Sequence, residues 1–219
     1  MIRGLLFDLD GLLFDSERIV QRSWNQAGQE MGYGNVGEHI YNTIGMNFEK
    51  RKEYFSTTFG SDFPHDKFRE RTREIFWDIT NKEGIHMKEG AKELICYAKQ
   101  MGYKIAVVTS SSEDYAAGVL KSKGIYQYFD GFVYGNMVKK SKPDPEANAT
   151  AAKILGFRPE YCVAFEDAPA GIQSATDAGI DTIMVPDLIQ PDEETKWRAW
   201  KIIERLDDAI ELLRLEARG

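Results

Sequence analysis

The stretch Leu5-Leu6-Phe7-Asp8-Leu9-Asp10-Gly11 passes from an apolar run to two acids and a glycine. The run before Asp8 is short and apolar throughout, which is typical of a strand buried on both faces of a parallel sheet. In extended backbone, residues two apart point to the same side, so Asp8 and Asp10 can face one cavity. Ligands of open α/β sheets bind at the carboxyl ends of the strands, where this pair falls. Taken alone, the same pattern also fits a solvated acidic turn.

Further apolar runs of strand length follow along the chain, at 105–108, 132–134, 162–165 and 182–185. The segments between them have helical periodicity, and several end at a glycine, as helices commonly do. These helical segments are 90–100, 115–123, 145–155 and 170–178. Alternation of strand and helix predicts an α/β, doubly wound (Rossmann-like) core with a mainly parallel sheet.

The alternation is interrupted over residues 15–88, where no comparable strand run occurs. This segment is amphipathic and rich in aromatic residues, which favours a helical cap domain inserted after the first strand. The core would then comprise residues 1–14 and 89–219. We expect the aromatic residues of the insertion to form its own core, and these are Trp24, Phe55, Phe68, Phe76 and Trp77.

The C-terminal tail carries apolar residues at helical spacing. Such a stripe predicts a helix that packs back on the core. Its members are Trp197, Trp200, Ile203, Leu206, Ile210 and Leu213.

The composition of the 219-residue chain is that of an ordinary globular protein, with 42% hydrophobic and 29% charged residues. A net charge of −7 argues against nucleic-acid binding and against a basic membrane-binding face. The first apolar run is too short for a signal peptide or a membrane span, so we expect a cytoplasmic protein, by default a monomer. Cys96 and Cys162 do not have zinc-site spacing.

Polar residues also follow the later strand runs. Thr109-Ser110-Ser111-Ser112 offers hydroxyl and amide donors for phosphate oxygens. Ser141-Lys142-Pro143-Asp144-Pro145 sets a lysine in a proline-bounded turn, where its ammonium can balance a phosphoryl group. Glu166-Asp167 supplies the carboxylate oxygens that magnesium prefers. Strand ends that carry in turn two acids, hydroxyls, a lysine and two acids predict a metal-dependent phosphoryl site.

In order and spacing, Phe7-Asp8-Leu9-Asp10-Gly11, Thr109, Lys142 and Glu166-Asp167 resemble the four motifs of the haloacid dehalogenase-like (HAD) superfamily. The resemblance covers nearly the whole chain. The helical insertion after the first motif is similar to the cap of the subgroup that contains β-phosphoglucomutase and pseudouridine-5′-phosphatase. The resemblance implies a phosphorylated small molecule as substrate and Mg²⁺ as cofactor.

The resemblance also implies roles for the matched residues. Asp8 would attack phosphorus and form an aspartyl-phosphate, and Asp10 would act as general acid and then general base. Thr109 and the Ser110 amide would hold phosphoryl oxygens, while Lys142 would neutralise charge. The metal would be bound by Asp8, by the backbone carbonyl of Asp10 and by Asp167, with Glu166 as a further ligand or as support for the ligands.

Several activities compete within this family. A dehalogenase lacks an acid at the position of Asp10, and a phosphonatase needs a Schiff-base lysine, for which the insertion offers Lys50 or Lys52. A β-phosphoglucomutase grips a distal phosphate with a cap arginine, and the matching position here is Phe48, with Arg51 three residues further on as the alternative. The sequence therefore favours a phosphatase over a mutase.

Two other classes of protein are disfavoured. A non-catalytic phospho-ligand-binding module would have lost motif residues that this chain retains, and a P-loop nucleotide binder would need a GxxxxGK[ST] motif. Glu17 and Asn47 are candidate substrate contacts in the insertion. His39, His65 and His86 are spaced too irregularly to predict a metal site.

Overall fold

The computed structural model describes residues 1–44, 46 and 48–216. The chain divides into two compact units, which we call the core unit (Met1–Phe14 with Met87–Gly219) and the inserted unit (Asp15–His86). The sequence led us to place the second boundary after residue 88, and in the structure it lies between His86 and Met87. Among the described residues, no helix has both the length and the apolar composition needed to cross a bilayer.

The core unit is built on a six-stranded sheet in the order β3-β2-β1-β4-β5-β6, in which every pair of neighbouring strands is parallel. The α/β class predicted from the sequence is therefore confirmed. The strands are β1 (Gly4–Phe7), β2 (Lys104–Val108), β3 (Gly131–Val133), β4 (Cys162–Glu166), β5 (Asp181–Met184) and β6 (Lys201–Ile202).

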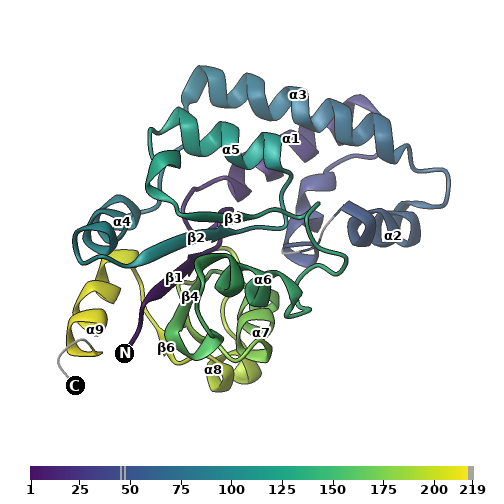
Figure 1. The fold of residues 1–219 in the computed structure, drawn as a ribbon. Coiled ribbons are helices and arrows are strands. Elements are labelled where there is room, and N and C mark those ends of the chain that lie inside the picture. Colours follow the sequence, from purple (N-terminus) through teal and green to yellow (C-terminus); the bar gives the residue numbers. More distant parts are fainter. Residues whose placement is uncertain (45, 47, 217–219) are drawn as a thin grey trace. The chain divides into compact units, whose positions relative to one another are not determined.

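Helices cover both faces of this sheet. From β1 the chain winds through α4 (Ala91–Gln100), β2 and α5 (Glu113–Ser122) to β3, and then returns through α6 (Glu146–Leu155), β4 and α7 (Pro169–Asp177) to β5. Since parallel crossovers are right-handed, the change of direction puts α6 and α7 on the face opposite α5, as Figure 1 shows. Short 3₁₀ segments occur at Tyr126–Tyr128 (η2) and Pro159–Tyr161 (η3).

Small side chains let α6 and α7 approach the sheet closely. Ala147, Ala151 and Ala175 pack with Leu6 of β1 and with residues of the neighbouring strands in one buried cluster. Because the strands are buried on both faces, they read as apolar runs without alternation. This burial of apolar surface is the main contribution to the stability of the core unit.

The prediction that the C-terminal tail forms one helix is wrong. The tail forms α8 (Glu193–Arg198), the edge strand β6, the 3₁₀ segment η4 (Leu206–Asp208) and α9 (Ala209–Glu216). The Trp200 and Ile203 amides donate to the carbonyls of β5, so sheet pairing overrides the helical spacing. Leu206 and Leu213 are buried as expected, but Trp197 is 84% exposed.

The inserted unit is helical, with α1 (Glu17–Glu30), η1 (Val36–Asn42), α2 (Phe48–Phe59) and α3 (His65–Glu83). Two ion pairs join opposite ends of α1 and α3, Arg22 with Glu83 and Glu30 with Arg71, so these helices run antiparallel. Its aromatic side chains form a core of their own: Trp24, Phe55, Phe68 and Phe76 are buried, while Trp77 is half-buried.

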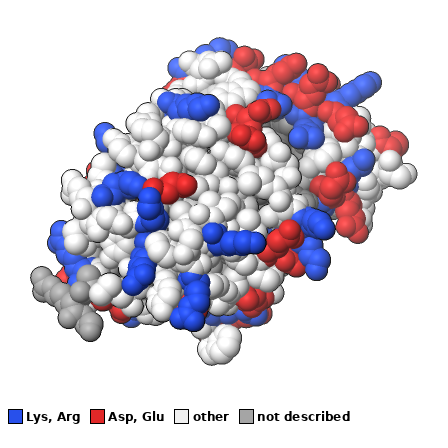
Figure 2. Space-filling model, viewed as in Figure 1, with Lys and Arg blue, Asp and Glu red and all other residues white. Residues whose placement is uncertain are grey.

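Acidic and basic side chains are interspersed on the face drawn in Figure 2.

Asp130, which precedes β3, accepts hydrogen bonds from two lysines and a backbone amide. Its carboxylate accepts hydrogen bonds from Lys99 Nζ at 2.7 Å, Lys104 Nζ at 2.9 Å and the Ile105 amide at 3.0 Å. Burial alone raises the pKa of Asp130, but these three donors outweigh it and lower the pKa to about 2.

We expect Asp130→Asn to lower the free energy of unfolding by about 1–2 kcal/mol at pH 7. Because the folded-state pKa lies below the ordinary value of 3.8, this stabilisation is present above pH 3.8 and is lost as the pH falls toward about 2. Urea unfolding of the wild type and of Asp130→Asn, repeated across this pH range, measures the difference in stability. Asp181→Asn, at an exposed position at the start of β5, is the control. A difference between wild type and Asp130→Asn that does not change with pH would contradict the assignment.

Candidate active site

The pairing of β1 with β4 brings two motifs together. Phe7 is in register with Phe165, and the Asp8 amide donates to the Phe165 carbonyl at 3.0 Å. Asp8 and Glu166 therefore emerge side by side at the carboxyl edge of the sheet. From these two strands the chain winds in opposite directions, so this edge is the switch point at which α/β proteins bind ligands.

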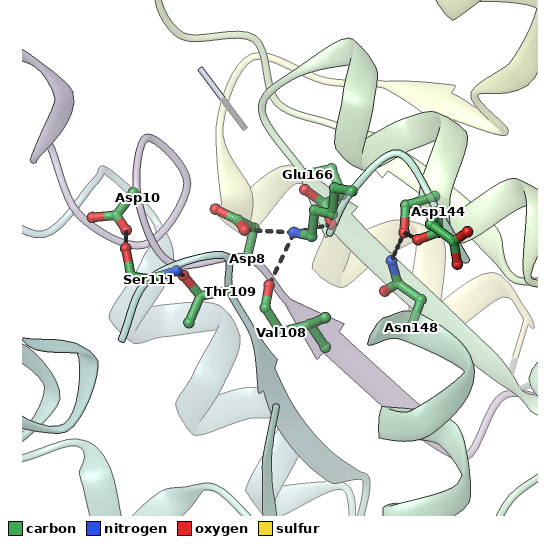
Figure 3. Close-up of polar contacts among 10 residues, drawn as sticks. Asp8, Asp10, Val108, Thr109, Ser111, Asp144, Asn148 and Glu166 are labelled. Atoms are coloured by element: carbon green, nitrogen blue, oxygen red, sulfur yellow. Dashed lines mark hydrogen bonds and ion pairs between the residues drawn. The ribbon is translucent and has the colours of Figure 1, made fainter. Parts of the chain in front are cut away.

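Lys142 lies between these carboxylates, and its ammonium donates hydrogen bonds to both of them and to a backbone carbonyl (dashed lines in Figure 3). Nζ donates to Asp8 Oδ1 at 2.6 Å, to Glu166 Oε1 at 2.7 Å and to the Val108 carbonyl at 2.9 Å. All four groups are buried, and the lysine is only 3% exposed. The sequence placed these residues after separate strand runs, and the structure brings them into direct contact.

Burial and charge act in opposite directions on these groups. Burial alone lowers the pKa of Lys142, but attraction by Asp8 and Glu166 outweighs it and raises the pKa above its ordinary value, so the ammonium stays charged. Burial raises the pKa of Glu166 to about 8, with Lys142 opposing and Asp8 reinforcing the effect. Burial likewise raises the pKa of Asp8. Without a bound cation, the cluster thus contains more carboxyl groups than the single Lys142 ammonium can neutralise.

The loop that carries Lys142 is fixed by hydrogen bonds on its far side. The Glu146 carboxylate accepts from the amides of Lys139 and Lys140, and the Ser174 hydroxyl donates to the Asp144 carbonyl at 2.7 Å. Asn148, which is fully buried, donates in turn to Ser174 Oγ at 2.9 Å. These bonds position the lysine before any ligand arrives.

Asp8, Glu166 and Asp167 each offer a carboxylate oxygen, and these atoms lie within 4.8 Å of one another. Two glycines make room for the cluster: a Cβ on Gly171 would lie 2.0 Å from Glu166 Oε2, and one on Gly11 would lie 2.2 Å from Asp167 Oδ2. Gly11 also has a φ of 83°, which other residues rarely adopt. Clustered hard oxygen donors with excess negative charge fit a divalent cation such as Mg²⁺.

Asp10 lies on the other side of the β2 end (Figure 3). Its Oδ2 accepts from the Ser111 hydroxyl and its Oδ1 from the Tyr115 hydroxyl, each at 2.7 Å. Thr109, which is buried, accepts the Ser111 amide at 3.0 Å with its hydroxyl oxygen, so that its hydroxyl hydrogen can point to another acceptor. Next to Thr109, the Ser110 backbone packs closely on Gly135. A Cβ on Gly135 would lie 2.1 Å from the Ser110 carbonyl oxygen.

The structure places most of the sequence-predicted residues in this region of the core unit. Asp8, Lys142, Glu166 and Asp167 form one cluster, and Ser111 links Thr109 to Asp10. Glu17 is the first residue of α1 in the inserted unit, and Asn47 lies outside the described residues.

Sequence reasoning assigned no role to Tyr115, and it counted Ser111 only among the hydroxyl donors for phosphate oxygens, not as a partner of Asp10. Their spacing of four residues at the start of a predicted helix was a signal that both side chains could lie on one side. No motif, however, pointed to a tyrosine.

The fold and the site define an α/β enzyme with a phosphoryl-type site at the carboxyl edge of its sheet. Residues 5–185 match the family model described as haloacid dehalogenase-like hydrolase. The chain is 34% identical over 184 residues to hexitol phosphatase A of Escherichia coli (strain K12), which covers 84% of this chain and 82% of the relative.

Several solved structures are also similar to this chain. The structure of CbbY from Rhodobacter sphaeroides in complex with phosphate has a TM-score of 0.82 at 25% identity and covers 95% of this chain and 96% of that one. β-Phosphoglucomutase from Clostridium difficile has a TM-score of 0.83 at 21% identity, with coverage of 100% and 98%, which is a likeness of fold. The chain belongs to the haloacid dehalogenase-like hydrolase family.

We expect Lys142→Ala to lower the free energy of unfolding by about 3 kcal/mol in metal-free buffer, because it leaves Asp8 and Glu166 buried without their cation. The midpoint of urea unfolding at pH 7.5 measures the loss. Lys140→Ala removes a lysine whose side chain is 75% exposed and should change stability by less than about 0.5 kcal/mol. Equal midpoints for the two variants would show that the lysine does not hold the cluster together.

Proposed function

We propose that this chain is a Mg²⁺-dependent phosphatase that hydrolyses a small phosphorylated metabolite, a sugar phosphate or a nucleotide-like monophosphate, through an aspartyl-phosphate on Asp8. The observation that carries the proposal is the buried Lys142 ammonium shared by Asp8 and Glu166, with Asp167 beside them. The lysine orients the Asp8 carboxylate and supplies positive charge where a phosphoryl group would bind.

In the first half-reaction, an oxygen of Asp8 forms a bond to phosphorus while the bond from phosphorus to the leaving oxygen breaks. Asp10 donates its proton to that leaving oxygen. In the second half, Asp10 takes a proton from water as the water oxygen bonds to phosphorus, and the bond to Asp8 breaks. Inorganic phosphate leaves, and both aspartates return to their starting states.

The Thr109 hydroxyl and the Ser110 amide would donate to the non-bridging phosphoryl oxygens, beside the Lys142 charge. Mg²⁺ would be held by Asp8, Glu166 and Asp167, together with the backbone carbonyl of Asp10, and would neutralise charge on the phosphoryl oxygens. Support for a cation comes from the excess of buried carboxylates over ammonium: burial, reinforced by the nearby Asp8, raises the pKa of Glu166 to about 8 in the protein alone, despite Lys142. A dianionic phosphate would otherwise be repelled by this cluster.

The mutase is the second candidate because the chain shares its fold with a β-phosphoglucomutase. Two contacts within the inserted unit favour the phosphatase. Phe48 stands where a mutase would carry its arginine, and the Arg69 guanidinium lies 4.3 Å from the centre of its ring. Arg51 lies over the ring of Trp24, at 5.8 Å from its centre, so it contributes to packing inside the unit.

We expect p-nitrophenyl phosphate to be hydrolysed with Mg²⁺ and not after removal of the metal by EDTA. Asp8→Asn should reduce turnover about 10³-fold or more, because an amide cannot act as the nucleophile. Asp62→Asn, an exposed change in the inserted unit, should retain wild-type turnover. Full activity of Asp8→Asn, or turnover that does not depend on the metal, would contradict the mechanism.

We expect release of free phosphate from members of a panel of sugar phosphates and nucleoside monophosphates to exceed isomerisation. The decisive comparison is β-glucose 1-phosphate, supplied with a catalytic amount of the bisphosphate, with glucose 6-phosphate and free phosphate both measured. Water as the acceptor gives phosphate, whereas a second sugar hydroxyl gives the isomer. Faster formation of glucose 6-phosphate would assign the chain to the mutases.

A further inference from the structure

Two hydroxyl groups hold the Asp10 carboxylate from one side. Ser111 donates to Oδ2 and Tyr115 to Oδ1, so each carboxylate oxygen has its own donor at 2.7 Å. Both donors come from the segment that follows β2, in which Ser111 precedes α5 and Tyr115 lies in the first turn of α5. The hydroxyls are thus fixed to one short piece of backbone.

The geometry matters because an aspartate carboxylate rotates readily about its last bond. That torsion joins an sp³ to an sp² carbon, for which the preferred wells are broad. A single donor leaves the second oxygen free to move, whereas two donors on different oxygens define the plane of the carboxylate. Proton transfer in turn requires the acid to be within hydrogen-bond reach of a particular oxygen.

We propose that Tyr115 is a positioning residue for Asp10, and that its hydroxyl fixes the plane in which the Asp10 carboxyl delivers its proton to the leaving oxygen. This inference rests on the proposed function, in which Asp10 is the general acid. Tyr115 acts through Asp10 and takes no part in the bonds at phosphorus. Loss of the Tyr115 hydroxyl should therefore slow the reaction most when the leaving oxygen needs a proton.

The test compares Tyr115→Phe with wild type on two aryl phosphates, p-nitrophenyl phosphate and phenyl phosphate. The two substrates are similar in shape, but the phenolate leaves less readily and depends more on protonation. We expect kcat/KM to fall about tenfold for phenyl phosphate and about twofold or less for p-nitrophenyl phosphate. An equal fall on both substrates, or no fall on either, would overturn the proposal.

A double-mutant cycle separates positioning from a general structural defect. Asp10→Asn should show the same preference for the better leaving group, and Asp10→Asn with Tyr115→Phe should be no slower than Asp10→Asn alone. Additive losses would mean that Tyr115 acts independently of Asp10. The control is Tyr161→Phe, which removes a hydroxyl that accepts from Arg158 at 2.9 Å elsewhere in the core unit and should leave both substrates unaffected.

A crystal structure of Tyr115→Phe gives a readout that does not depend on turnover. We expect the Asp10 carboxylate to rotate or to occupy more than one orientation, with Lys142 still bound to Asp8 and Glu166. An unchanged Asp10 would overturn the positioning role even if the protein proved inactive on every phosphate ester. Failure of the proposed function would instead appear as absent Mg²⁺-dependent turnover in the wild type, so the two failures are distinguishable.

Discussion

The contact on which the site depends is the Lys142 ammonium, buried between Asp8 and Glu166 and completed by the Val108 carbonyl. Removing such a charge from water costs several kcal/mol, which only well-aligned partners can offset. The three acceptors come from the ends of three neighbouring strands, β1, β2 and β4. One side chain therefore ties together the carboxyl edge of the sheet, where we propose that the chemistry takes place.

That contact is possible because the backbone has already set the distances. The register of β1 with β4 places Asp8 beside Glu166, and the hydrogen bonds of Asp144 and Ser174 hold the lysine loop from behind. Gly11 and Gly171 supply the missing space, since any Cβ there would overlap a carboxylate. The acids are thus held close together by packing, against their mutual repulsion.

The sequence was sufficient for the parts of the molecule that repeat a simple pattern. Buried parallel strands read as unbroken apolar runs, and polar residues at their ends marked the site, because carboxyl ends of parallel strands share one edge. The edge strand β6 was missed because the residues that flank it, Trp200 and Ile203, have helical spacing in the sequence, whereas in the structure their amides donate to β5. Tyr115 was missed for a related reason: its contact with Asp10 joins residues distant in sequence, and no local pattern encodes it.

The positive and negative groups of the site divide into two sets with different partners. Asp8 and Glu166 share a lysine, whose charge they stabilise, whereas Asp10 accepts hydrogen bonds from the hydroxyls of Ser111 and Tyr115. Ammonium pairing suits the role that we propose for Asp8, whose carboxylate must stay charged to attack phosphorus. Hydroxyl partners can turn to donate or accept, so they can remain bonded to a carboxyl that alternately gives and takes a proton. Two aspartates that are two residues apart along the chain thus lie in different settings, which suit them to two different steps of the proposed reaction.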